Sequence, residues 1–363
     1  MQNLFRTLEG VTYPLPMFFP DATRGFVRTL SNQDVRATGT QGILVNSFHL
    51  FRLVGYEKTI KAGGIRPYIG WKGPIISDSG GFQVMSIAKR KEGRAAVSDL
   101  GVQFEIEGER YLFTPEESIK YQMAMQTDLI VVLDDFTPVT ADYEEAERTV
   151  RRTTLWARRC REVFDSECRR LHISKDKRPY IIGVVQGCYF EDLRKRSARE
   201  LLEIGFDGYG YGGWPMKDGS FDIGTAKLIA EVLPKDTLLY GLGIGKPDDI
   251  VKCYELGWQI FDCVLPTRDA RHGRLYVYTA DSMDEIDLKK DKFYEFYNPK
   301  KLIHTTEEYP VSTACDCELC TTLTRGELAR MWRDRDERVL RLATIHNLRF
   351  YAVLMEKIGN MVK

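Results

Sequence analysis

The chain has 363 residues, of which 43% are hydrophobic and 29% are charged, and this composition allows a large buried core. Its 52 basic residues balance its 52 acidic ones, so any nucleic-acid partner must be bound by a local basic patch rather than by the overall charge. The sequence has no apolar run of the roughly 18 residues that a membrane helix needs, and residues 1–10 do not have the layout of a signal peptide. These features predict a cytoplasmic protein with no membrane contact.

Short apolar runs that each end in a polar or glycine residue recur along the chain. Eight of them are residues 15–19, 42–46, 74–78, 128–134, 180–186, 206–213, 238–243 and 259–265. Strands that are buried on both faces of a parallel sheet have this pattern, and crossover helices must join them. Eight such units predict an α/β fold of the TIM (β/α)8 barrel type, in which functional sites lie where the strands end.

The segments between these runs carry helix signals. Thr114 is followed by a proline and two glutamates, the order of a helix N-cap and first turn, and residues 192–204 are amphipathic up to Gly205. Two segments do not fit the repeat. Residues 102–113 predict an inserted hairpin, and residues 274–296 predict an irregular excursion after the last strand.

The C-terminal region contains four residues with metal-ligand spacing: Cys315, Cys317, Cys320 and His346. Three thiolates and one imidazole complete a tetrahedral Zn²⁺ site and leave no open position, so we expect a structural zinc. The alternative is three free cysteines and a surface histidine. We therefore divide the chain into a barrel, residues 1–299, and a zinc-binding subdomain, residues 300–363, whose C-terminal helices pack on the barrel.

The segment from Ser77 to Gln83 places Asp78 at a strand end, before two glycines and Phe82. Glycines let a flat ligand approach the backbone, and an aromatic ring can stack on it. Taken alone, the segment also fits a capping aspartate in a tight turn before a helix.

Two neighbouring strand ends carry polar groups that match a purine. Asp134 would accept hydrogen bonds from the N1 and N2 donors of guanine, while Gln186 and the backbone near Gly213 would donate to its carbonyl. Asp135 is adjacent, and we favour Asp134 as the residue that faces the base. Asn46, at the end of another strand, is counted with the substrate-binding residues.

Asp262 lies within an apolar stretch, where an ionised carboxylate is costly unless it is paired or functional. Glycosyl transfer can use one carboxylate as the nucleophile and a second carboxyl group for proton transfer, and Asp262 and Asp78 fit these catalytic roles. The alternative is a buried structural pair between Asp262 and an arginine such as Arg268.

Basic residues follow Asp262 closely. Arg268, Arg271 and Arg274 lie within seven residues of one another and form a strip that could contact RNA phosphates. A solvated arginine loop is the alternative. Leu242 lies in a glycine-rich segment, 241–247, and could cover one face of a flat base opposite Phe82.

Together these motifs resemble the tRNA-guanine transglycosylase family over nearly the whole chain. The matching segments are 46–50, 77–83, 184–187, 206–209, 245–249, 261–268 and the Cys3His set. The resemblance implies a glycosyltransferase that exchanges the wobble guanine of a tRNA anticodon loop for a 7-deazaguanine, preQ1 or queuine, through a covalent aspartyl intermediate. It makes Asp262 the nucleophile and Asp78 the general acid/base, and it also implies a structural zinc and a homodimer.

The loop from Trp214 to Asp218 departs from the family pattern, in which small aliphatic residues, a glycine and a glutamate follow the two glycines. This loop reads the 7-substituent of the incoming base, so the identity of that base stays open. Two other readings remain. One is a catalytically silent RNA-binding subunit, which the costly carboxylate of Asp262 disfavours, and the other is a related enzyme that inserts a deazaguanine into DNA.

Overall fold

Eight parallel strands form a barrel in the computed structural model, which describes residues 4–81, 97–106, 108–217 and 219–361. The strands follow one another around the barrel in chain order, and a parallel bridge between Asp21 and Leu44 brings the two edges together. They are β3 (Met17–Pro20), β4 (Ile43–Asn46), β5 (Ile75–Asp78), β9 (Leu129–Val131), β10 (Tyr180–Val185), β11 (Gly208–Tyr211), β14 (Leu238–Gly241) and β15 (Ile260–Cys263). Each overlaps one of the eight predicted runs, so the predicted TIM barrel is confirmed.

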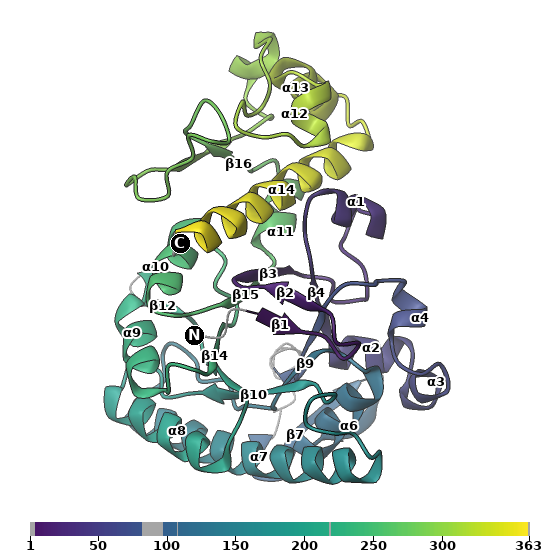
Figure 1. Ribbon diagram of the computed structural model, residues 1–363, viewed down its shortest axis with the longest axis vertical. Helices are drawn as coiled ribbons and strands as arrows, with labels where there is room; N and C mark the ends of the chain where they lie inside the picture. The colour runs from purple at the N-terminus through teal and green to yellow at the C-terminus, as the bar shows by residue number, and fades with distance from the viewer. Residues whose placement is uncertain (1–3, 82–96, 107, 218, 362–363) are drawn as a thin grey trace.

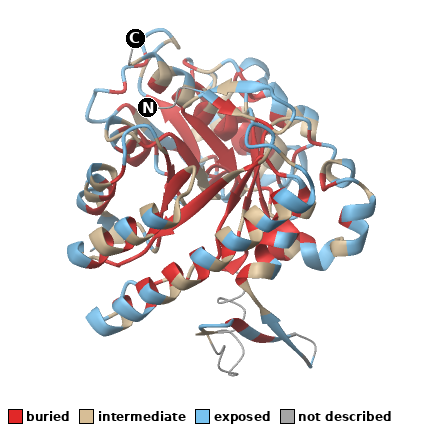
Figure 2. Cartoon of the chain, turned by 60° about the horizontal axis from the view of Figure 1, so that its bottom comes forward, coloured by how far each residue is buried: buried red, intermediate tan, exposed pale blue. Residues whose placement is uncertain are grey.

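Helices surround the barrel (Figure 1). They are α1 (Asn32–Ala37), α2 (Ser47–Leu53), α3 (Tyr56–Lys61), α4 (Arg66–Ile69), α6 (Pro115–Met125), α7 (Tyr143–Arg170), α8 (Glu191–Ile204), α9 (Ile223–Val232), α10 (Pro247–Glu255) and α11 (Leu265–Arg271). The helices present mixed buried and exposed faces, whereas the strands of the barrel are almost wholly buried (Figure 2). This burial on both faces explains why the strands have no polar alternation in the sequence.

The predicted helix boundaries are confirmed where they rested on capping signals. The Thr114 side chain accepts a hydrogen bond from the backbone of Glu117 at 3.2 Å, and the Glu117 carboxylate accepts one from Thr114 N. This capping box begins α6 at Pro115. Helix α8 ends before Gly205, whose positive φ of 85° suits glycine.

Short antiparallel sheets lie outside the eight-stranded barrel. They are β1 (Leu4–Arg6) with β2 (Thr12–Pro14), β6 (Val97–Ser98) with β7 (Gly101–Ile106) and β8 (Glu109–Phe113), β12 (Met216–Lys217) with β13 (Ser220–Phe221), and β16 (Leu275–Tyr278) with β17 (Tyr294–Tyr297). The predicted hairpin at 102–113 is confirmed as β7 and β8. The prediction for 274–296 was wrong at both ends of the segment, because the aromatic residues of β16 and β17 pair in a regular ladder.

The C-terminal segment consists of the 3-10 helix η1 (Leu302–Thr306) and the helices α12 (Glu318–Thr322), α13 (Arg325–Arg333) and α14 (Arg338–Asn360). Helix α14, yellow in Figure 1, runs from this segment across the barrel beside α11. One cluster of buried side chains joins Val45 and Ile75 of the barrel with Leu319 and Leu342 of the segment. The domain boundary at residue 299 stays a prediction. No helix among the described residues is long and apolar enough to cross a membrane.

Candidate active site

A cavity of about 510 Å³ lies at the carboxyl ends of the barrel strands. Asp78 from β5, Asp134 after β9 and Asp262 from β15 all line it. The carboxyl ends of all eight strands meet at this edge of a parallel barrel, so residues far apart in the chain converge there. The structure therefore brings together the three aspartates that the sequence singled out.

Asp262 is held by two hydrogen bonds to one of its oxygens. The hydroxyl of Tyr240 donates to Oδ1 at 2.9 Å, and the backbone N–H of Gly243 donates to the same oxygen at 3.0 Å. Among the described residues, Oδ2 has no hydrogen bond. Burial raises the pKa of Asp262 to about 6, although these two donors act in the opposite direction. The structural pair with Arg268 that the sequence left open does not form, since no ion pair joins the two side chains.

Asp78 lies in a denser network of donors. The Asn46 amide donates to both carboxylate oxygens, at 2.9 and 2.8 Å, and the backbone N–H groups of Ser47 and Gly80 donate to Oδ1 at 3.3 and 3.1 Å. Burial and the nearby charge of Asp262 together raise the pKa of Asp78 to about 7, although these donors act in the opposite direction. Asp78 is therefore the one of this pair that more readily keeps a proton near neutral pH.

Asn46 occupies a different place from the one expected of a substrate-binding residue. It is fully buried and does not line the cavity. Its oxygen accepts a hydrogen bond from His49 N at 2.8 Å and thereby caps α2, while its amide nitrogen binds Asp78. Asn46 thus acts on the carboxyl group of Asp78 rather than on a ligand.

The two adjacent aspartates, Asp134 and Asp135, have separate environments. Asp134 lines the cavity and accepts a hydrogen bond from the Gln186 amide at 2.6 Å, and burial raises its pKa to about 6. Asp135 is buried against Arg152 of α7, with a nitrogen–oxygen distance of 2.5 Å. The preference for Asp134 as the group that faces the cavity agrees with this geometry.

Gln186 is fully buried beneath the cavity wall. Its oxygen accepts a hydrogen bond from Thr137 at 3.0 Å, and one of its amide N–H groups donates to Asp134. Gln186 itself does not line the cavity. A side chain at Gly212 would lie 2.8 Å from the Gln186 amide nitrogen, so only glycine fits there. Gly213 follows with a positive φ of 83° and lines the cavity.

The wall beyond Gly213 is apolar. The residues that line it are Trp214, Pro215, Met216, Phe221 and Phe136, and Leu242, directly after β14, also lines the cavity. Trp214 is 53% exposed and stands at the mouth. Phe82, the expected partner of Leu242, and Asp218 lie outside the described residues.

The three arginines expected to contact RNA have different surroundings. Arg268 is exposed and lines the cavity, and the exposed Arg274 stacks its guanidinium 3.7 Å from the ring centre of Phe296. Arg271 is partly buried, and one of its terminal nitrogens has no hydrogen-bond partner among the described residues. A buried donor without a partner can be satisfied by an anion.

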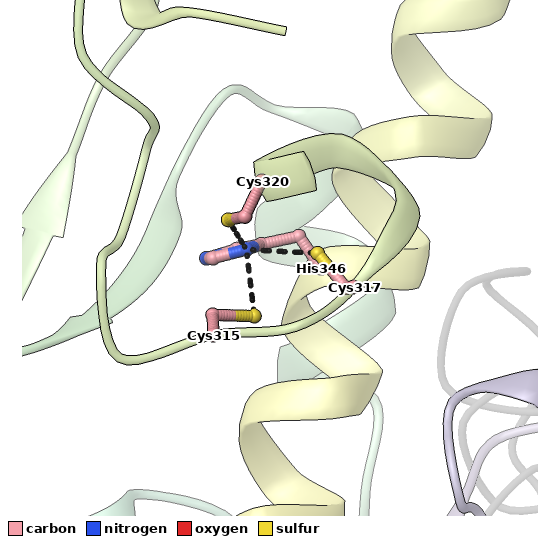
Figure 3. A group of neighbouring side chains, drawn as sticks. All are labelled: Cys315, Cys317, Cys320 and His346. Carbon is pink, nitrogen blue, oxygen red and sulfur yellow. Dashed lines mark hydrogen bonds between the residues drawn. The ribbon is translucent and has the colours of Figure 1, made fainter. Parts of the chain in front are cut away.

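The Cys3His set forms one compact group on α12, the turn before it and α14 (Figure 3). The sulfurs of Cys315, Cys317 and Cys320 lie 3.7, 3.5 and 3.2 Å from Nδ1 of His346. Tetrahedral zinc with ordinary bond lengths separates sulfur and nitrogen ligands by about 3.6 Å. Nε2 of His346 lies 2.7 Å from the carbonyl oxygen of Tyr276, which fixes the ring with Nδ1 toward the sulfurs. The four residues therefore suit a structural zinc, as predicted.

A family model described as queuine tRNA-ribosyltransferase matches residues 5–363. The chain belongs to this family. The queuine tRNA-ribosyltransferase of Solidesulfovibrio magneticus is 34% identical over 354 residues, which cover 96% of this chain and 87% of that protein. Those of Thermodesulfovibrio yellowstonii and Shewanella baltica are each 35% identical, over 99% and 97% of this chain and 88% of either protein.

Sequence reasoning missed two residues that support the site in this family member. Tyr240 interrupts an otherwise aliphatic strand, which was the available signal, and its hydroxyl binds Asp262. Arg194 on α8 is only 2% exposed, and no carboxylate pairs with it among the described residues. It donates instead to the carbonyl oxygens of Val185, Cys188 and Gly212, at 2.5, 2.8 and 2.9 Å. Nothing local in the sequence marks this arginine as buried.

Proposed function

We propose that this chain is a tRNA-guanine transglycosylase, a pentosyltransferase that exchanges the wobble guanine of a tRNA anticodon loop for a 7-deazaguanine in queuosine modification. The observation that carries the proposal is the pair of cavity aspartates, Asp78 and Asp262, from separate strands of the barrel. Membership of the queuine tRNA-ribosyltransferase family agrees with it.

In the first half of the reaction, Oδ2 of Asp262 attacks C1′ of the ribose. The bond between C1′ and N9 of guanine breaks as the bond between C1′ and Oδ2 forms, and Asp78 gives its proton to the departing base. The hydrogen bonds from Tyr240 and Gly243 hold the other oxygen of Asp262 and leave Oδ2 for the sugar. These roles agree with the pKa values of about 6 for Asp262 and about 7 for Asp78.

In the second half, the 7-deazaguanine occupies the place of guanine. Asp78 takes the proton from its N9, N9 forms a bond to C1′, and the bond to Asp262 breaks to restore the carboxylate. Both bases present the same hydrogen-bonding edge to the cavity, so one set of protein groups can bind them in turn.

Asp134, Gln186 and Gly213 would bind that common edge, with Leu242 over one face of the base. The carboxylate of Asp134 accepts from the base, and the unused N–H of Gln186 and the backbone N–H at Gly213 donate to it. Asn46 takes the role of a positioning residue for Asp78 rather than a base contact.

Arg268, Arg271 and Arg274 would contact the phosphates of the anticodon loop. One buried nitrogen of Arg271 has no hydrogen-bond partner among the described residues, so it could donate to a phosphate. Arg268 lines the cavity itself. We also propose that the enzyme acts as a homodimer in the cytoplasm. Exposed apolar side chains of α2, α3 and α4 would suit contact with a second copy: Phe51, Leu53, Ile60 and Tyr68.

The proposal is tested by transfer of radiolabelled guanine into unmodified tRNA, with DNA of the same sequence in parallel. We expect incorporation into tRNA only. Asp262→Ala should reduce exchange at least about a thousandfold and abolish the denaturant-resistant RNA adduct, because the covalent bond can no longer form.

Cys168→Ala serves as the control, since Cys168 lies on α7 away from the cavity, and it should exchange guanine at the wild-type rate. No exchange despite measured tRNA binding would favour a silent RNA-binding subunit. Exchange into DNA would favour the DNA transglycosylase. An adduct that persists in Asp262→Ala would assign the nucleophile to another residue.

A further inference from the structure

Five aspartates line the cavity, and they differ in their hydrogen bonds. Asp21, Asp78, Asp134, Asp249 and Asp262 all face it. Four of them accept hydrogen bonds from side chains: Asp21 from Thr23, Asp78 from Asn46, Asp134 from Gln186 and Asp262 from Tyr240. Asp249 is the exception. Among the described residues, its carboxylate has neither a hydrogen bond nor an ion pair.

Asp249 lies in the first turn of α10, between the cavity edges of β14 and β15, and only 6% of it is exposed. Its neighbour Asp248 behaves as an ordinary structural group, because it accepts a hydrogen bond from Tyr294 at 2.9 Å and does not line the cavity. The two aspartates thus share one helical turn but point to different surroundings.

A buried carboxylate without donors is costly, and the helix N-terminus offsets only part of that cost. Burial, followed by the charge of Asp248, raises the pKa of Asp249 to about 6, and the charges of Lys246 and Lys252 reduce the shift. The protein therefore keeps a hydrogen-bond acceptor on the cavity wall that the described part of the chain does not use.

The described part of the loop after β11, the strand beside β14, has several of its acceptors already engaged. In the loop after β11, the carbonyl oxygens of Gly212, Pro215 and Met216 already accept hydrogen bonds from Arg194, Asp222 N and Tyr189. The side chains that this loop presents to the cavity are apolar. A ligand with an additional donor group would find a side-chain acceptor in Asp249.

We propose that Asp249 is a specificity residue that accepts a hydrogen bond from a donor group of the substrate, either a ribose hydroxyl or the ammonium or hydroxyl of a 7-substituent. The inference rests on the proposed function. A ribose hydroxyl is one candidate donor because Asp249 lines the same cavity as Asp262, the residue that would attack the ribose. Asp262 lies on β15, and Asp249 lies in the first turn of α10. The 7-substituent source follows from the apolar side chains that the described part of the loop after β11 presents to the cavity, because Asp249 offers a carboxylate there.

Two kinetic series on Asp249→Asn distinguish these sources. In the first, guanine, 7-aminomethyl-7-deazaguanine and queuine are compared as incoming bases on tRNA. In the second, guanine exchange is compared between anticodon stem-loops that have ribose or 2′-deoxyribose at the wobble position. Asp248→Asn is the matched control, because it makes the same substitution one residue away and outside the cavity.

We expect Asp249→Asn to lower kcat/KM about tenfold or more in one of the two series. This is the effect of removing a hydrogen bond to a charged group. If the donor is on the base, KM rises for the two substituted bases and not for guanine. If the donor is on the ribose, the wild type prefers ribose, and the variant loses that preference. Asp248→Asn should behave like the wild type in both series.

Asp249→Ser provides a second neutral variant if the asparagine enzyme does not fold, as judged by its Tm. Calorimetric titration with the aminomethyl base and with the two stem-loops measures the same contacts without turnover. If the wild-type protein transfers no guanine into tRNA, the proposed function is refuted. The calorimetric affinities for the base and the stem-loops would still show whether Asp249 contacts them. Unchanged base affinities together with unchanged ribose selectivity would overturn the inference.

Discussion

Carboxylates in this cavity owe their properties to burial more than to their direct partners. Asp78 and Asp262 both receive hydrogen bonds that favour the charged form, yet the pKa of each is raised. Loss of water around a charge outweighs two to four donors here. Asp78 has the higher pKa although it receives more donors, because the charge of Asp262 adds to the effect of burial, and this separates the two groups.

This separation predicts a bell-shaped pH profile of kcat/KM for guanine exchange. Below about pH 6 the nucleophile Asp262 becomes protonated, and above about pH 7 Asp78 loses the proton that the leaving base needs. The rate should therefore rise through the first value and fall through the second. Initial rates in buffers from about pH 5 to about pH 9, at constant ionic strength, measure both limbs.

Asn46→Ser tests the assignment of the alkaline limb. Serine retains a capping oxygen for α2 but removes the two N–H bonds to Asp78, which favour its charged form. The pKa of Asp78 should rise, and the alkaline limb should move to higher pH while the acidic limb stays. An unchanged alkaline limb would assign it to a group other than Asp78.

At the scale of elements, the site depends on how the ends of β10 and β11 are held together. Arg194 reaches from α8 to the carbonyl oxygens of Val185 and Gly212, which immediately precede Gln186 and Gly213. Its guanidinium also lies 4.9 Å from the ring centre of Tyr211. Arg194 is thus a positioning residue, since it ties together the strand ends that would bind the base without lining the cavity itself.

Arg194→Lys should raise KM for guanine by about tenfold while kcat changes less. Lysine keeps the charge but has no planar fork to reach several carbonyls at once, so the two strand ends would lose their fixed spacing. Steady-state guanine exchange measures both constants. Arg196→Lys on the same helix is the control, because Arg196 is partly exposed and pairs with Glu200. A wild-type KM in Arg194→Lys would show that the spacing does not depend on this contact.

At the scale of the whole molecule, the cysteine cluster joins the C-terminal segment to the barrel. Cys317 and Cys320 belong to the same buried cluster as Val45 and Ile75, and His346 on α14 binds the backbone of β16. A metal at this point would hold α12 to α14, which in turn packs on α11. Zinc is therefore expected to stabilise the fold without contact with the cavity.

Metal analysis should find about one zinc per chain, and Cys317→Ala should lose it. We expect the Tm of this variant to fall by about 10 °C or more, since metal binding contributes directly to folding. Differential scanning calorimetry measures the change. Cys168→Ala, a cysteine outside the cluster, should keep the metal. Full zinc content in Cys317→Ala would contradict the ligand set.

The sequence alone was sufficient for features that depend on local pattern. Apolar runs located all eight barrel strands, and the spacing of Cys315, Cys317 and Cys320 located the metal group. Asp78, Asp134 and Asp262 could be selected because each follows or ends such a run. The order of parallel strands then requires their ends to share one edge, so their convergence was also predictable.

Only the tertiary structure decided which neighbouring groups act on these residues. Asp134 and Asp135 are adjacent in sequence, and it is Arg152 on the following helix, α7, that distinguishes them. Asn46 turned toward Asp78 rather than the cavity, and Asp249 became buried on its wall. These partners come from separate elements that folding brings together, and burial then raises the pKa of each cavity carboxylate. Composition and spacing describe the chain locally, whereas the chemistry of the cavity depends on contacts across the barrel.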